Sequence, residues 1–170
     1  MAGGTSIPVL VGVKDGRVLI RPIGPCTLVA CDLLGPTLEG FHKPDTTDVY
    51  FDLSQADTVD STFTGMLLGL ATGRKGPSTP AVHLIRPTPR VVDVLGQMHV
   101  LRLFDVCESM PDAPAELNPL TAQSGDREKL RDLVIDAHKD LIEADPRNAA
   151  TFGRVVSGLE NERRDRPVNP

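Results

Sequence analysis

The chain opens with two short apolar runs that flank a turn. Residues 7–13 and 18–23 are rich in Val, Ile and Leu, and the pair Asp15-Gly16 lies between them. An Asp-Gly pair between two such runs favours a type I′ hairpin turn, because both central residues of that turn need a positive φ. Pro22 indicates an edge position or an early stop for the second strand. The pattern therefore predicts an N-terminal β-hairpin.

After the hairpin, the apolar positions switch between helical and strand-like spacing. The polar stretch 54–59 between two of these segments is expected to form a loop that returns to the interior. Strands that alternate with helices imply an α/β fold with a mixed, mostly parallel β-sheet and crossover helices. Helices are predicted at 27–41, 63–72 and 89–98, and strands at 48–53, 81–85 and 101–106.

The last third of the chain has a different character. Two amphipathic helices follow a stretch rich in Pro, Ala, Asp and Ser, and Asp145-Pro146 fits the N-cap and first turn of the second helix. A lone helical pair buries too little apolar surface to be stable. We expect it to pack on the domain or on a second subunit as a homodimer contact, with recruitment of a distinct partner as the alternative. The predicted division is an α/β domain at 1–108, a linker at 109–125 and a two-helix C-terminal extension at 126–170.

Composition narrows the classes of function. The net charge of −5 over 170 residues argues against binding to nucleic acid, which needs a basic face. The sequence has no apolar run of the roughly 20 residues that span a bilayer, so we expect no direct membrane insertion. The N-terminus lacks the basic and long apolar regions of a signal peptide, so we expect a cytoplasmic protein.

The residue types of catalytic and metal sites are present without the spacing that such sites need. The three cysteines form no Cys-x-x-Cys pair and are expected to be reduced and buried. The four histidines do not pair at helical spacing, and no nucleophile elbow or phosphate-binding glycine loop occurs. We therefore expect no metal, no cofactor and no enzymatic activity.

The triplet Asp60-Ser61-Thr62 precedes the predicted helix at 63–72. Asp and Ser are good N-cap residues, since their side-chain oxygens accept hydrogen bonds from the free N–H groups of the first turn. Capping is the simplest role for this triplet, and it is compatible with a regulatory one.

Residues 49–62 carry a more specific pattern. An apolar strand ends in Asp-Leu-Ser, a short loop follows, and Asp60-Ser61-Thr62 opens a helix. This pattern resembles the signature of the STAS family, which includes the anti-anti-sigma factors of sporulation and stress signalling and the cytoplasmic domains of sulphate transporters. Residues 89–95 and 103–106 resemble the last helix and strand of that family, and the resemblance covers about residues 6–108.

The resemblance implies a phosphorylation site. In antagonist members, a partner anti-sigma kinase phosphorylates the second hydroxyl residue of the triplet, which here is Thr62, with Ser61 as its neighbour. The sequence departs from the family at Phe63, where Gly is usual, and this puts a bulky ring beside the acceptor. The residues expected to contact a partner are Asp57, Asp60, Phe63, Thr64 and Met66.

A phosphate at this position would make a switch. The first turn of a helix tolerates an anion, yet phosphate adds about −1.5 to −2 charges beside Asp57 and Asp60. A docked partner would meet that charge at a buried contact. The sequence thus predicts an anti-sigma factor antagonist, a partner-switching module of transcription regulation that binds an anti-sigma factor or kinase-like protein. The alternatives are a STAS subunit docked to a membrane transport complex and a nucleotide or small-molecule sensing domain.

Overall fold

The computed structural model describes residues 8–73, 78–121 and 125–165, so Ile7 of the predicted first strand and parts of the predicted linker and tail lie outside the described residues. The N-terminal hairpin is confirmed. Strands β1 (Val9–Lys14) and β2 (Arg17–Pro22) pair antiparallel. Asp15 and Gly16 both have positive φ, at 52° and 73°, as a type I′ turn requires.

Pro22 ends its strand, which is one of the two predicted alternatives, and the other alternative, an edge position, does not occur. Strand β2 lies inside the sheet, between β1 and β4 (Asp48–Asp52). The pairing with β4 stops at Ile20, so Pro22 lies beyond the last residue that pairs on that side. The missing N–H of the proline therefore leaves that ladder intact.

The main sheet has six strands in the order β7-β6-β4-β2-β1-β8. Strands β2, β4, β6 (Ala81–Ile85) and β7 (Asp105–Cys107) are parallel, and β1 is antiparallel to its neighbours. The mixed, mostly parallel sheet with crossover helices is thus confirmed.

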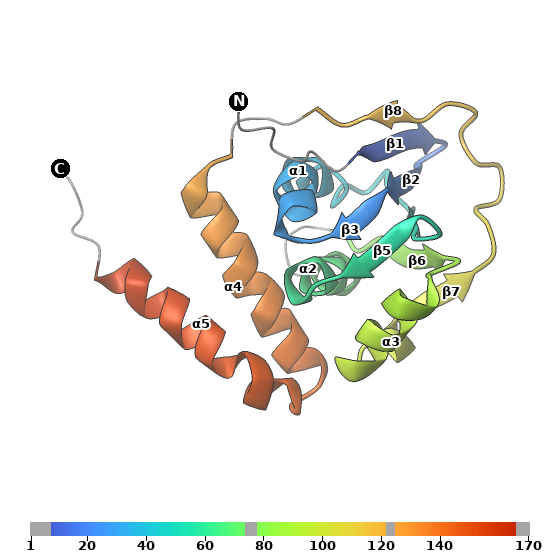
Figure 1. The fold of residues 1–170 in the computed structure, drawn as a ribbon. Coiled ribbons are helices and arrows are strands. Elements are labelled where there is room, and N and C mark those ends of the chain that lie inside the picture. The colour runs from blue at the N-terminus through green and yellow to red at the C-terminus, as the bar shows by residue number, and fades with distance from the viewer. Residues whose placement is uncertain (1–7, 74–77, 122–124, 166–170) are drawn as a thin grey trace, which may run out of the picture.

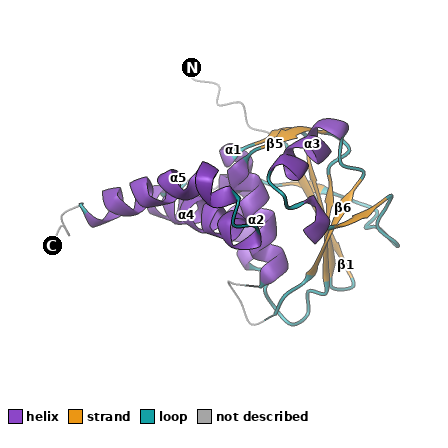
Figure 2. Ribbon diagram, turned by 90° about the horizontal axis from the view of Figure 1, so that it is seen from below, coloured by secondary structure: helices purple, strands orange, loops and turns teal. Residues whose placement is uncertain are grey.

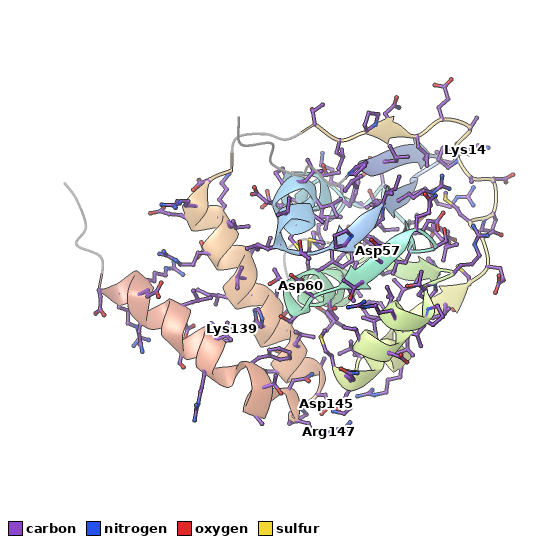
Figure 3. The ribbon with its side chains drawn as sticks, in the orientation of Figure 1. Lys14, Asp57, Asp60, Lys139, Asp145 and Arg147 are labelled. Atoms are coloured by element: carbon purple, nitrogen blue, oxygen red, sulfur yellow. The ribbon has the colours of Figure 1, made fainter. Side chains whose placement is uncertain are left out.

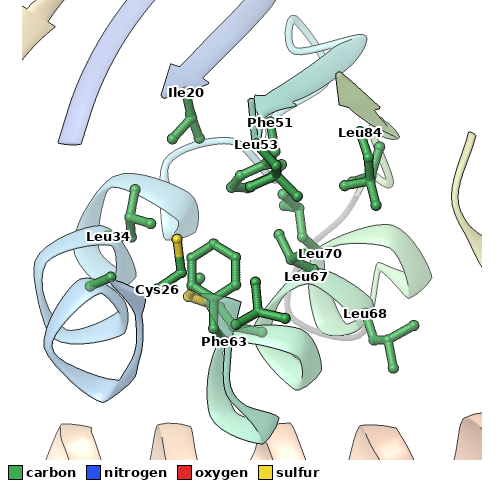
Figure 4. Close-up of a cluster of buried hydrophobic side chains, with 14 of the residues drawn as sticks. Ile20, Cys26, Leu34, Phe51, Leu53, Phe63, Leu67, Leu68, Leu70 and Leu84 are labelled. Atoms are coloured by element: carbon green, nitrogen blue, oxygen red, sulfur yellow. The ribbon is translucent and has the colours of Figure 1, made fainter. Parts of the chain in front are cut away.

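Three helices connect the parallel strands: α1 (Leu28–Glu39), α2 (Ser61–Thr72) and α3 (Pro89–Gln97). Each crossover moves one strand further in the same direction, and right-handed crossovers of this kind put their helices on one face. Figure 2 shows α1 and α2 to one side of the strands. Side chains from strands and helices form one apolar core on that face, part of which Figure 4 shows in close-up. Its members include Ile20, Phe51 and Leu84 from the sheet and Leu34, Phe63 and Leu67 from α1 and α2.

Two local predictions need correction. The expected loop at 54–59 contains strand β5 (Ala56–Val59), which pairs with β3 (Gly24–Cys26) in a second, two-stranded parallel sheet. The expected strand at 101–106 begins instead with a 3₁₀ turn at Leu101–Leu103. Both differences arise from pairing partners that are distant in sequence, because β5 needs β3 and β7 pairs with β6 only from Asp105 onward.

The predicted linker packs against the sheet. Strand β8 (Asn118–Pro119) pairs with β1, and Met110 and Leu117 pack with Tyr50 on the face opposite the helices. The described part of this segment is therefore attached along the sheet, while the predicted domain boundaries remain a prediction.

The C-terminal extension consists of α4 (Arg127–Ala144) and α5 (Asn148–Arg164), which confirms two helices. Helix α4 packs on the domain, against α2, and α5 lies outside α4 (Figure 1). Asp145 was predicted as the N-cap of the second helix, which instead begins at Asn148. The Asp145 carboxylate caps the preceding turn by accepting the N–H of Arg147. None of the described helices is long and apolar enough to cross a bilayer.

Candidate functional site

The start of α2 is organised by Asp60, which is the N-cap that the sequence predicts. Its Oδ1 accepts the backbone N–H of Phe63 at 2.7 Å, and its Oδ2 accepts the N–H of Leu28 at 3.0 Å. One carboxylate therefore satisfies free N–H groups of two helices, α2 and α1. Asp60 has a structural role here, and its contact with a partner remains a prediction.

Ser61 opens α2 and faces α4. Its Oγ lies 2.9 Å from Nε2 of His138, whose Nδ1 lies 2.7 Å from the carbonyl oxygen of Val134. A carbonyl can only accept, so Nδ1 carries a proton. In the neutral ring, Nε2 then accepts the hydrogen bond from the Ser61 hydroxyl. The imidazole is buried and packs edge-on against Phe152 of α5.

This serine–histidine pair has the distances of a nucleophile and its base. Such a pair needs space for a reacting carbonyl or phosphoryl group beside the serine oxygen. Here His138 is 4% exposed and packs between α2 and α5. In this conformation the geometry serves to attach α4 to α2.

Thr62, the predicted phosphorylation site, is buried and 6% exposed. Phe63 and Thr64 are fully buried, and Met66 is buried as well. The Phe63 ring packs edge-on against Phe51 in the core, so this departure from the family pattern does not place the ring over the hydroxyls. Four of the predicted site residues are thus inaccessible in this conformation, since α2 is packed between the sheet and α4.

The approach of α4 to α2 is unusually close. A Cβ at Gly65 would collide with the carbonyl oxygen of Ala137, and one at Gly69 would come within 2.7 Å of Oδ2 of Asp140. Gly65 and Gly69 are four residues apart and therefore share one face of α2 with Ser61. No local pattern in the sequence indicates that α4 packs against these two glycines.

The exposed part of the site lies at the start of α1. Leu28 is 36% exposed and Val29 is 55% exposed, beside the Asp60 carboxylate that binds the Leu28 N–H. Asp57 on β5 is also exposed, at the same end of the domain as Asp60 (Figure 3). Sequence reasoning missed Leu28 and Val29 as surface residues. The available signal was that Cys31, Leu34 and Leu38 already supply the buried face of α1.

The neighbouring thiols are chemically quiet. Cys26 and Cys31 are fully buried, as predicted, while Cys107 is half-buried. Burial, with the negative charges of Asp60 and Asp57, raises the pKa of Cys26 to about 12. A thiol with so high a pKa is a poor nucleophile at neutral pH. No group of three or more His, Cys, Asp or Glu side chains that could hold a metal occurs in the described ranges.

No protein-family model and no curated protein matches the sequence. Solved structures do match. A candidate anti-sigma factor antagonist from Thermotoga maritima is 18% identical over 59% of this chain and 86% of its own, with a TM-score of 0.46. The anti-sigma factor antagonist SpoIIAA in its unphosphorylated form is 16% identical over 61% of this chain and 89% of its own, with a TM-score of 0.48. This chain is similar to both in fold. The resemblance of the sequence to the STAS family implied this kind of fold.

Proposed function

We propose that this chain is a regulatory protein-binding module of the anti-sigma factor antagonist type, and that modification of Thr62 or Ser61 switches its binding. The observation that carries the proposal is the position of the two hydroxyl residues. They form the first turn of α2, directly after Asp60, whose carboxylate also binds the N–H of Leu28 at the exposed start of α1. The proposed modification site and the proposed partner surface are thus joined through one carboxylate.

The chemistry of this helix start suits a charge switch. A phosphate on Ser61 or Thr62 would lie near the positive end of the helix dipole and beside the carboxylate of Asp60. A partner that contacts Leu28 and Val29 with apolar groups would lose affinity when that charge appears at the edge of the contact. The proposed partner is an anti-sigma factor or a kinase-like protein.

A sensing role has one observation in its favour. A cleft of about 550 Å³ lies between α1, α2 and α4, with Met66 and Leu33 in its wall. The predicted ligand position was the helix start at Asp60, whereas the cleft lies further along α2. Its wall carries Asp32, Glu39 and Asp132, and these carboxylates disfavour the phosphates of a nucleotide. We therefore rank this function second. Docking to a membrane transport complex has no specific observation in its favour.

The test of the main proposal is a pull-down with the full chain as bait, read by mass spectrometry. The baits are wild type, Thr62→Glu and Ser61→Glu, with Thr62→Val and Ser157→Glu as controls. Thr62→Val keeps the shape of the buried side chain without charge, and Ser157 is an exposed serine on α5. The expected result is that wild type and both controls capture an anti-sigma or kinase-like protein, and that Thr62→Glu loses it.

Circular dichroism of every bait verifies that binding losses do not reflect unfolding. Capture of the same proteins by all five baits would contradict the switch and leave Asp60-Ser61-Thr62 as a helix cap. Membrane proteins among the shared captures would favour the docking alternative.

A further inference from the structure

Helix α4 covers the side of α2 that carries Ser61, one of the two hydroxyl residues of the proposed switch. The two helices make the most extensive helix–helix contact in the described part of the chain, through Ser61 and His138 at one end and Gly69 and Asp140 further along. Of the two hydroxyl residues, Thr62 is buried and Ser61 is half-buried. A kinase or a partner could not reach the Thr62 hydroxyl in this conformation.

We propose that α4 and α5 form an intramolecular lid over α2, so that modification of Thr62 or Ser61 requires α4 to separate from α2. The inference deepens the proposed function and rests on it for the role of Thr62. The contact between α4 and α2 is observed in this structure and does not depend on that role.

The composition of the contact suits a reversible lid. The buried residues of α4 are Ile135, Ala137, His138, Asp140 and Leu141, so two of five are polar or ionisable. Interfaces that open and close are more polar than permanent cores. The close approach at Gly65 adds backbone packing with little apolar area.

The two C-terminal helices are also held to each other. Lys139 pairs with Glu160 at 2.5 Å, and Arg163 pairs with Asp132 at 3.4 Å. His138 packs on Phe152 across the same helix pair. These contacts join α4 to α5 and do not involve α2. The hydrogen bond from Asn148 to Met98 and the Arg102–Asp145 pair tie the turn between the two helices to α3 and the segment after it, so this turn is the natural hinge of the lid.

The lid makes the modification depend on the open state. A phosphate on Ser61 would occupy the position of the His138 ring, because the two side chains are already in hydrogen-bond contact at 2.9 Å. The apparent rate of modification falls in proportion to the fraction of open molecules. A mutation that displaces α4 should therefore raise access to residue 62.

The test measures access directly and needs no partner. The thiol introduced by Thr62→Cys is alkylated with iodoacetamide in the full chain, in a Cys107→Ser background. Cys26 and Cys31 are fully buried and serve as slow internal references. Gly65→Ala is the variant expected to displace α4, since its Cβ would meet the rigid backbone carbonyl of Ala137. Gly96→Ala is the matched control, because a Cβ on that α3 glycine meets no atom within 4 Å.

The expected result is alkylation about tenfold faster with Gly65→Ala and little changed with Gly96→Ala. Hydrogen exchange should show faster exchange in α4 with the sheet still protected. Unchanged alkylation in a folded Gly65→Ala chain would overturn the lid.

If Gly65→Ala does not fold, the proposal is tested with Gly65 intact, by measuring alkylation of the residue 62 thiol at increasing urea concentrations. The lid predicts that the residue 62 thiol reacts at urea concentrations that leave the sheet folded. Reaction only in step with global unfolding would overturn it. A pull-down that finds no partner refutes the proposed function and leaves these alkylation rates unaffected.

Discussion

At the scale of single residues, the carboxylate of Asp60 connects more of the site than any other side chain described. It accepts N–H groups from Phe63 and Leu28, which belong to helices separated by two strands in the chain. The backbone carbonyl of Asp60 also accepts the hydroxyl of Thr64 at 2.8 Å. Its loss should therefore affect both α1 and α2.

Asp60→Ala should lower the free energy of unfolding by about 2 kcal/mol, because two backbone N–H groups lose their acceptor. Asp60→Asn keeps one oxygen and should cost about half as much. Urea denaturation followed by circular dichroism measures both. Asp126→Ala, which removes a cap from the exposed start of α4, is the control and should cost less. Equal losses for Asp60→Ala and Asp126→Ala would contradict the shared cap.

At the scale of elements, the sequence predicted those parts whose pattern is local. The hairpin at Asp15-Gly16 and the start of α2 at Asp60 both follow from neighbouring residues, and both are confirmed. Strand β5 was missed because its pairing partner β3 lies about thirty residues earlier and its own residues, such as Asp57, are polar. The candidate site was predicted as a surface. The site is buried because α2 is packed between the sheet and α4, and no local sequence pattern specifies the position of α4.

A second attachment of the C-terminal helices lies at the start of α5. The side-chain amide of Asn148 is buried and donates to the carbonyl oxygens of Met98 at 2.9 Å and Leu141 at 2.8 Å. These bonds connect the turn between α4 and α5 to the end of α3. The amide is therefore a support for the extension that is independent of α2.

Asn148→Ala should destabilise the extension by about 2 kcal/mol, because buried carbonyl groups lose their donor. Hydrogen exchange should become faster in α5 and the end of α4, with the sheet unchanged. Asn161→Ala, at an exposed position of the same helix, is the matched control. Equal exchange in both variants would show that the extension is held elsewhere.

At the scale of the whole molecule, the chain is layered around one sheet. Met110 and Leu117 pack on one face, α1 to α3 cover the other, and α4 and α5 lie outside α2 (Figure 1). Helix α5 leaves Val155 exposed, and a homodimer through this surface remains a prediction. Near the middle of the sheet, β4 carries an acidic residue at each end, Asp48 and Asp52.

These two carboxylates make global stability sensitive to acid. Burial alone would raise the pKa of Asp52, but hydrogen bonds from Ser54 and Arg21 hold it below the usual value of 3.8. The hydrogen bond from His83 lowers the pKa of Asp48. A carboxyl whose pKa is lowered on folding contributes stability above its unfolded pKa, and that contribution is lost as the pH falls through its folded pKa.

The free energy of unfolding should therefore fall as the pH drops below about 5, and more steeply below about 4. Urea denaturation between pH 7 and pH 3 measures the slope. Asp52→Asn cannot lose a charge, so its slope should be smaller even though its stability at pH 7 is lower. An equal slope in the two proteins would exclude Asp52 as a source of the acid sensitivity.

The Asp60 carboxylate binds N–H groups of two helices and therefore couples the start of α2 to the start of α1. A second anion placed on residue 61 or 62 would compete with Asp60 for the Phe63 N–H, since all three groups crowd one helix start. Loss of the hydrogen bond between Asp60 and the Phe63 N–H would change the strength of the hydrogen bond between Asp60 and the Leu28 N–H, the first amide of α1. Modification of a buried hydroxyl could in this way alter the apolar surface at Leu28 and Val29 without touching it.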